Sequence, residues 1–249
     1  MDSFVTFCLR MGDNALILGQ RTAEWCGHAP VLEEDIAFAN MGLDLIGQTQ
    51  MWYALAGEAE GAGRSPDDLA FLRTERQYLS ALLVEQPNVD FGHALMRQYL
   101  FDAWHLPMLD LLSESRHDGV KALARKAVKE VRYHLDRSRD LIVRLGDGSE
   151  ESHDRMQAAL EALWPFTADL VATDAVDEKM VADGIAPDPA RVATAFRAET
   201  EATLARATLD IPQSGLKRTG GRDGLHTEHM GYLLAEMQSL QRTYPGARW

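Results

Sequence analysis

The stretch KEVRYH, residues 129–134, contains the two residue types that hold iron in helical di-iron proteins. In those proteins a Glu and a His three residues apart on one helix, with a single Glu on a neighbouring helix, point into the centre of a bundle. Here Glu130 precedes His134 by four residues, and Val131 stands at the position three before the histidine. The carboxylate is therefore displaced by one residue from the ligand position, so the remaining ligand positions decide whether a metal site exists.

The other ligand positions follow from the geometry of two helical hairpins, one turning near residue 30 and the other near residue 117. Residues that lie level with each other in such hairpins give six would-be ligands: Ala15 or Leu16, Leu45, Gln48, Asp102, Val131 and His134. Only Asp102 and His134 are conventional iron ligands, whereas a di-iron centre needs several carboxylates and two imidazoles. We therefore expect no metal and no catalytic residue at these degenerate positions.

Three polar residues, Asn14, Asp44 and Glu130, lie one residue away from the ligand positions. Bringing them inward requires a helix to turn by about 100°, which would expose its apolar stripe to water. We interpret His134 as a core histidine that is hydrogen-bonded to a buried carboxylate, with Asp102 as the suggested partner. The competing hypothesis is a metalloenzyme that uses Asp102, His134 and nearby carboxylates such as Glu130.

Apolar residues recur at steps of three and four along almost the whole chain, which predicts helices and no strand of consequence. Ser65, Pro66 and Asp68 form a capping signal, and Pro107 predicts a kink or break. The predicted helices cover approximately residues 4–26, 36–56, 66–83, 91–115, 120–145, 150–173, 188–209 and 225–243. This pattern indicates an all-α helical bundle with additional C-terminal helices, in a single domain over residues 1–249. Its core hairpins cover about 3–56 and 91–145, and a C-terminal helical extension covers about 188–249.

Composition limits the classes of function. The net charge of −13 over 249 residues argues against nucleic acid as a partner, because phosphate binding needs a basic face. No apolar run approaches the roughly 18 residues of a membrane span, and the start of the chain lacks the pattern of a signal peptide. Two cysteines, Cys8 and Cys26, fit free thiols in a reducing compartment. We therefore expect a cytoplasmic protein that binds neither nucleic acid nor membrane.

Several long motifs carry a resemblance to a known family. They are RMGDNALILGQRTAEWCGHAPVLEEDIAFANMGLDLIGQ, LLVEQPN, RQYLFDAWH, AVKEVRYHL and RTGGRDGLHTEHMGYLLAEMQSLQRTYPGARW. Together they resemble the C subunits of bacterial phenylacetyl-CoA 1,2-epoxidases, the phenylacetate-CoA oxygenases, over nearly the full length. The resemblance implies a non-catalytic, ferritin-like structural subunit in phenylacetate catabolism.

The resemblance also implies partners. The catalytic subunit of such a complex would hold the di-iron centre and bind the CoA thioester, and a reductase with NADPH, FAD and an iron–sulfur centre would supply electrons. The catalytic relatives have stretches like DEAGH and KEExxH, where this chain has DLIGQ at residues 44–48 and KEVRYH. No cofactor is therefore expected on this chain. Its expected partners are the catalytic subunit and the other subunits of the complex, with a homodimer as a further alternative.

The C-terminal region holds the residues that we expect to contact the catalytic subunit or CoA. A second cluster of possible ligands lies at the start of the last predicted helix and contains His226, Glu228 and His229. We interpret this cluster as a hydrogen-bonded helix cap or a subunit contact rather than a metal site. The cationic loop with Lys217, Arg218 and Arg222 fits a solvated loop, an ion-paired interface with the catalytic subunit, or a contribution to CoA phosphate binding. Trp249, at the last position, is expected to dock on this chain or on a neighbour because a free indole is an apolar liability.

Overall fold

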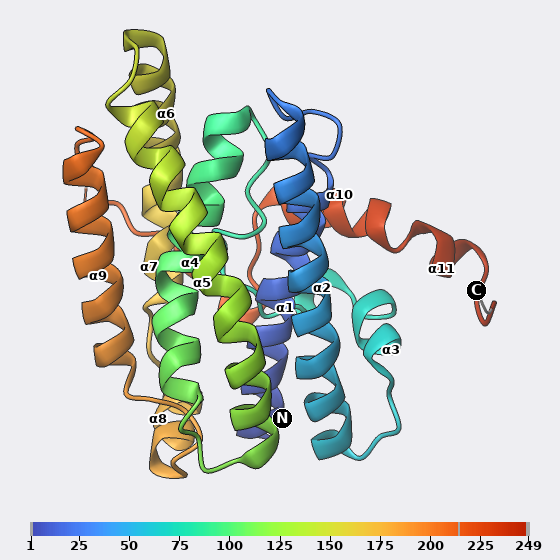
Figure 1. Ribbon diagram of the computed structural model, residues 1–249. Coiled ribbons are helices and arrows are strands. Elements are labelled where there is room, and N and C mark those ends of the chain that lie inside the picture. Colours follow the sequence, from blue (N-terminus) through green and yellow to red (C-terminus); the bar gives the residue numbers. More distant parts are fainter. Residues whose placement is uncertain (1, 214, 248–249) are drawn as a thin grey trace.

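Two antiparallel helical hairpins, α1 with α2 and α4 with α5, form the centre of the computed structural model (Figure 1). The structure describes residues 2–213 and 215–247. Its longer helices are α1 (Ser3–Ala23), α2 (Leu32–Glu60), α4 (Phe91–Leu112), α5 (Asp118–Gly146), α6 (Glu150–Leu163) and α9 (Pro189–Arg206). Its shorter helices are α3 (Pro66–Phe71), α7 (Thr167–Leu170), α8 (Ala175–Ala182), α10 (Glu228–Met237) and α11 (Ser239–Thr243). No strand is present in these two ranges, and the predicted all-α, ferritin-like bundle is confirmed.

Local signals in the sequence set the ends of these helices. The Asp2 carboxylate accepts a hydrogen bond from the Phe4 amide at 2.8 Å, and the Asp90 carboxylate accepts one from the His93 amide at 2.8 Å. Ser65 and Asp68 form the expected capping box before α3. These side chains satisfy amide groups that have no partner inside their own helix, so α1, α3 and α4 begin at these residues. No helix in the described part of the chain is long and apolar enough to cross a bilayer.

Helix α1 is buried on every side. All residues from Val5 to Gly19 are buried, including the polar residues Asp13 and Asn14. Asn14 is therefore buried without any turn of the helix, because α1 has no water-facing side along this stretch. Asp13 and Asn14 instead satisfy backbone groups of a neighbouring segment.

That segment is residues 72–90, where the predicted helix 66–83 is correct in its start but wrong beyond residue 71. Helix α3 ends at Phe71, and the chain continues as an irregular, largely buried connection with a short 3₁₀ turn at Glu75–Gln77. The Leu79 amide donates to Asp13 Oδ2 at 2.7 Å, and the Ala81 amide donates to Asn14 Oδ1 at 2.7 Å. Buried backbone groups need partners, and the side chains of α1 provide them where a helix would otherwise do so.

Other boundaries also differ from the predicted ones. The predicted helix 150–173 ends at Leu163, and residues Trp164–Phe166, which include a proline without an amide hydrogen, form a 3₁₀ turn before α7. Helix α8, whose first turn is closed by a capping box of Asp174 and Asp177, was not predicted. The predicted helix 225–243 is divided into α10 and α11, while α4 continues through Pro107 without a break.

We expect Gly12→Ala to destabilise the protein by about 1–3 kcal/mol, because a side chain at residue 12 would overpack the contact between α1 and α2. A Cβ at this position would lie 2.6 Å from the ring of Tyr53. A Cβ at Gly47 of α2 meets nothing within 4 Å. Gly47→Ala is therefore the matched control and should be neutral or stabilising by up to about 1 kcal/mol. Urea unfolding curves of both variants measure the difference, and equal effects would contradict this role of Gly12.

Candidate functional site

The positions that hold iron ligands in related bundles lie together in the core of the bundle, on α2, α4 and α5. Leu45, Gln48, Asp102, Val131 and His134 all have side chains with no exposure to solvent. The helical spacing in the sequence therefore identified five residues that are buried in the core. Their hydrogen bonds decide whether these side chains could bind a metal ion.

His134 pairs with a different carboxylate from the one suggested. Its Nε2 lies 2.9 Å from Asp44 Oδ2, so the interpretation as a hydrogen-bonded core histidine is confirmed while Asp102 as its partner is wrong. Asp44 lies at the edge of α2 with 38% of its side chain exposed, and it reaches inward without any rotation of the helix. The Nδ1 atom of His134 has no hydrogen-bond partner among the described residues.

Asp102 is held within its own helix. The amide Nε2 of Gln98 donates to both carboxylate oxygens at 3.0 Å, and the hydroxyl of Thr22 on α1 donates to Gln98 Oε1 at 3.3 Å. Burial raises the pKa of Asp102 to about 7, although the charge of His134 and the Gln98 hydrogen bond act in the opposite direction. The carboxyl group therefore titrates near neutral pH.

His105, one turn after Asp102 on α4, was not recognised from the sequence. It is buried beside the ring of Phe101, with 4.8 Å between ring centroids. Burial, with a smaller contribution from the charge of His134, lowers the pKa of His105 to about 3, so the ring is neutral at physiological pH. The signal that could have revealed it is the i, i+3 spacing within Asp102-Ala103-Trp104-His105.

Gln48 and Glu130 form another contact between α2 and α5. Gln48 Nε2 donates to Glu130 Oε2 at 3.1 Å, and Gln48 Oε1 has no partner among the described residues. Glu130, like Asp44, thus reaches the interface of the two helices from a position one residue away from the ligand position. Each carboxylate is already engaged by a neutral amide or by the imidazole of His134.

This set of donors does not fit a di-iron centre. Apolar side chains, Leu45 and Val131, stand where carboxylates would have to neutralise two metal ions, and Gln48 stands in place of an imidazole. Within the described ranges, no three His, Cys, Asp or Glu side chains gather in a group that could hold a metal ion. No metal-dependent step follows from the residues at this centre.

His226 lies inside the protein, where it pairs with Glu85. Its Nδ1 is 2.6 Å from Glu85 Oε2, its Nε2 is 2.9 Å from the Tyr78 carbonyl oxygen, and both side chains of the pair are inaccessible to solvent. Burial lowers the pKa of His226, but the hydrogen bond and charge of Glu85 outweigh it and raise the pKa above its ordinary value. The other oxygen of Glu85 accepts from the amide and hydroxyl of Thr227.

The remaining candidate contact residues have different environments. Glu228 is exposed in the first turn of α10, and His229 is half-buried one residue later. Lys217 and Arg218 are exposed, and the Arg218 guanidinium lies 5.8 Å from the centroid of the Phe166 ring. Trp249 lies outside the described residues. His226 is therefore unavailable to a partner, whereas Lys217, Arg218 and Glu228 remain accessible.

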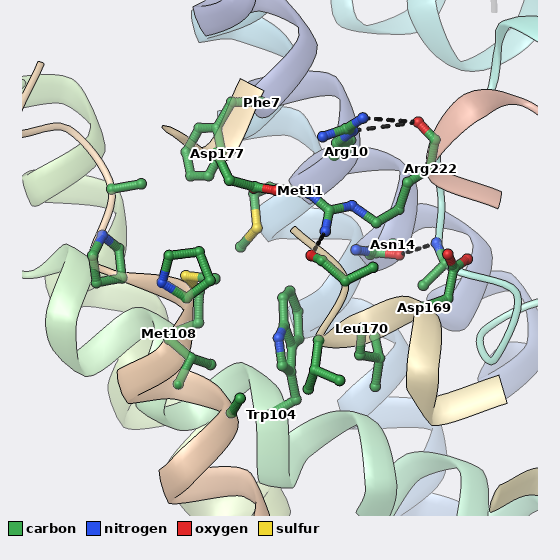
Figure 2. Close-up of a pocket in the computed structure, with 18 residues that line it drawn as sticks. Phe7, Arg10, Met11, Asn14, Trp104, Met108, Asp169, Leu170, Asp177 and Arg222 are labelled. Atoms are coloured by element: carbon green, nitrogen blue, oxygen red, sulfur yellow. Dashed lines mark hydrogen bonds and ion pairs between the residues drawn. The ribbon is translucent and has the colours of Figure 1, made fainter. Parts of the chain in front are cut away.

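Arg222 belongs to an internal network of ion pairs beside a small pocket. Its guanidinium donates to Asp177 Oδ2 at 2.7 Å and to the Ala172 carbonyl oxygen, while its own carbonyl oxygen accepts from Arg10. Figure 2 shows this pocket between Arg10, Arg222 and Trp104. Its volume is about 40 Å³, which accommodates water but no aromatic substrate. The guanidinium of Arg222 is thus engaged within this chain.

Comparison with known proteins agrees with the resemblance found in the motifs. The family model described as phenylacetic acid catabolic protein matches residues 1–249. The chain is also 49% identical to the C subunit of the 1,2-phenylacetyl-CoA epoxidase of Escherichia coli (strain K12) over 249 residues, which is 100% of each chain. The chain therefore belongs to the phenylacetic acid catabolic protein family.

Proposed function

We propose that this chain is a non-catalytic structural subunit of a multicomponent di-iron monooxygenase that epoxidises the aromatic ring of phenylacetyl-CoA. The 49% identity to the C subunit of an epoxidase supports the reaction and the complex. The observation that carries the non-catalytic role is the pair Leu45 and Val131, which are fully buried where a catalytic bundle needs carboxylates.

The mechanism open to such a subunit is packing against the catalytic subunit. A chain that binds only the folded form of its partner stabilises that form by mass action. This bundle needs no metal to fill its centre, since apolar side chains and the Gln98–Asp102 and Gln48–Glu130 hydrogen bonds occupy it. In this proposal the di-iron centre and the NADPH, FAD and iron–sulfur groups belong to partner subunits, and the complex is cytoplasmic.

The alternative is a metalloenzyme that would draw on Asp102, His134 and Glu130. The hydrogen bonds of the centre argue against it, because each of these side chains already has a protein partner: Gln98, Asp44 and Gln48. Metal binding would have to break these three contacts, of which the Gln98–Asp102 contact is fully buried, where unpaired polar groups are costly.

Metal analysis separates the two hypotheses. The chain is expressed alone in iron-supplemented medium, purified without chelator and measured by plasma mass spectrometry. We expect far less than one iron per chain, whereas about two irons per chain would establish a di-iron protein and overturn the proposal.

Co-production tests the structural role itself. The catalytic subunit is produced with and without this chain, and its soluble yield and activity are measured. We expect the two chains to co-purify, and we expect the catalytic subunit to lose soluble yield when it is produced alone. If the catalytic subunit can be purified without this chain and is fully active, the hypothesis of a structural role is wrong.

A further inference from the structure

An open cleft lies at the edge of the molecule, away from the buried centre. Its walls are formed by residues between 164 and 171, by one face of α9, and, after α9, by residues 211–212 and 215–217. Its volume is about 300 Å³, at the lower end of the range of small-molecule sites. Figure 1 shows α9 on the far side of the bundle from α2 and α3. The cleft is thus distant from α2 and α3, and it adjoins the pocket beside Arg222, with which it shares Val171 and Ala193.

The base of the cleft is aromatic and apolar. The rings of Trp164 and Phe196 are stacked, with 6.3 Å between their centroids and 21° between their planes. Val171 and Ile211 complete this apolar lining, and both are partly buried. Both rings belong to the lining of the cleft, and aromatic surface of this kind favours a flat apolar group in offset or edge-to-face contact.

Two cations stand at the rim of this apolar base, one on each wall. Arg197 comes from α9 and Lys217 from the loop, and both are exposed. Their side chains have no ion pair or hydrogen bond within residues 2–213 and 215–247, although most arginines of this acidic chain are ion-paired. Glu201, the acid that also lines the cleft, is exposed. The rim therefore has two charged donors free to take an anion.

We propose that this cleft binds an amphipathic carboxylate with a flat or aryl body. The apolar body lies against Trp164 and Phe196, and the carboxylate lies between Arg197 and Lys217. Arginine presents two parallel donors that match a carboxylate, and the ammonium of Lys217 adds a second positive charge. This inference goes beyond the subunit role, since it concerns a site that belongs to this chain alone.

The test uses phenylacetate as the probe, titrated into the purified full-length chain by calorimetry at low ionic strength. Two analogues each lack one of the two groups that the cleft is proposed to recognise: acetate lacks the aryl body, and 2-phenylethanol lacks the negative charge. We expect phenylacetate to bind at least tenfold more tightly than either analogue. No heat from phenylacetate at millimolar concentration, or equal affinity for acetate, would overturn the proposal.

Variants locate the binding site. The double charge reversal R197E/K217E should weaken phenylacetate binding at least tenfold, and A168W, which fills the lining beside Trp164, should abolish it. Lys126 is an exposed cation on α5 outside the cleft, so K126E is the matched control and should leave affinity unchanged. Circular dichroism confirms that each variant is folded. Unchanged affinity in both cleft variants, or an equal loss in K126E, would place the binding elsewhere and refute the proposed site.

Discussion

Asp13→Asn is expected to lower the free energy of unfolding by about 3–5 kcal/mol, because it leaves the guanidinium of Arg73 buried without a counter-charge. Asp13 and Arg73 form an ion pair with side chains that are 0% and 3% exposed. The carboxylate also accepts from the hydroxyl of Tyr53 at 2.5 Å and from the Leu79 amide at 2.7 Å. An asparagine has a similar shape, so the loss reports the charge and its hydrogen bonds.

The surroundings of Arg73 explain why no other group can replace Asp13. The guanidinium lies 4.2 Å from the centroid of the Tyr78 ring and 5.1 Å from that of Tyr53, and it donates to the Leu69 carbonyl oxygen at 2.5 Å. None of these partners carries a negative charge. Urea unfolding followed by circular dichroism measures the effect, with the exposed Asp67→Asn as control. The control should change stability by no more than about 0.5 kcal/mol. A loss below about 1 kcal/mol for Asp13→Asn would contradict this expectation, because it would show that the buried charge of Arg73 is compensated without Asp13.

Asp102→Asn is expected to change the pH dependence of stability rather than simply lower stability. The pKa of Asp102 is about 7 in the folded protein, against an ordinary value of 3.8. Between these values the folded state binds more protons than the unfolded state, so this group makes wild-type stability fall as pH rises from about 4 to 7. Asparagine does not titrate. The stability of the variant relative to wild type should therefore increase by about 3–4 kcal/mol across this window.

His105→Gln gives a control of opposite sign. The pKa of His105 is about 3 in the folded protein against 6.5 ordinarily, so the unfolded state binds the extra proton between these values. Its contribution to wild-type stability therefore rises with pH up to about 6.5, and the relative stability of the variant should fall over that interval. Unfolding curves at half-unit steps from about pH 4 to 8 test both variants. Parallel profiles for Asp102→Asn and wild type would show that Asp102 is already charged at about pH 5.

The two central hairpins were predictable from the sequence because their buried residues recur at the three- and four-residue spacing of an α-helix. On α5, Val120, Leu123, Ala127, Val131 and His134 recur at helical spacing, and all of them are buried. The same spacing located the buried centre and its missing carboxylates. Helix starts at Ser65 and Asp188 were also predictable, since capping depends on residues within one turn.

Features that depend on distant partners were not predictable. The irregular segment 72–90 has helix-like spacing, but the side chains of Asp13 and Asn14 take up its amide groups from more than 60 residues away. The partner of His134 depends on how far Asp44 reaches from the edge of α2, which periodicity does not describe. The buried pair of Glu85 and His226 is separated by 141 residues. Local patterns contain no information about such pairs.

The pairing of Glu85 with His226 has a consequence for the order in which the chain completes its structure during synthesis. The N-terminal hairpin and the segment beside it leave the ribosome long before residue 226, and until then the Glu85 carboxylate lacks the imidazole to which it pairs in the core. Arg10 likewise waits for the Arg222 carbonyl oxygen, 212 residues later. Burying a carboxylate without its partner is costly, so we expect this part of the core to close only after the middle of the chain is made. The last 30 or so residues thus close a bundle whose first helices were synthesised at the beginning.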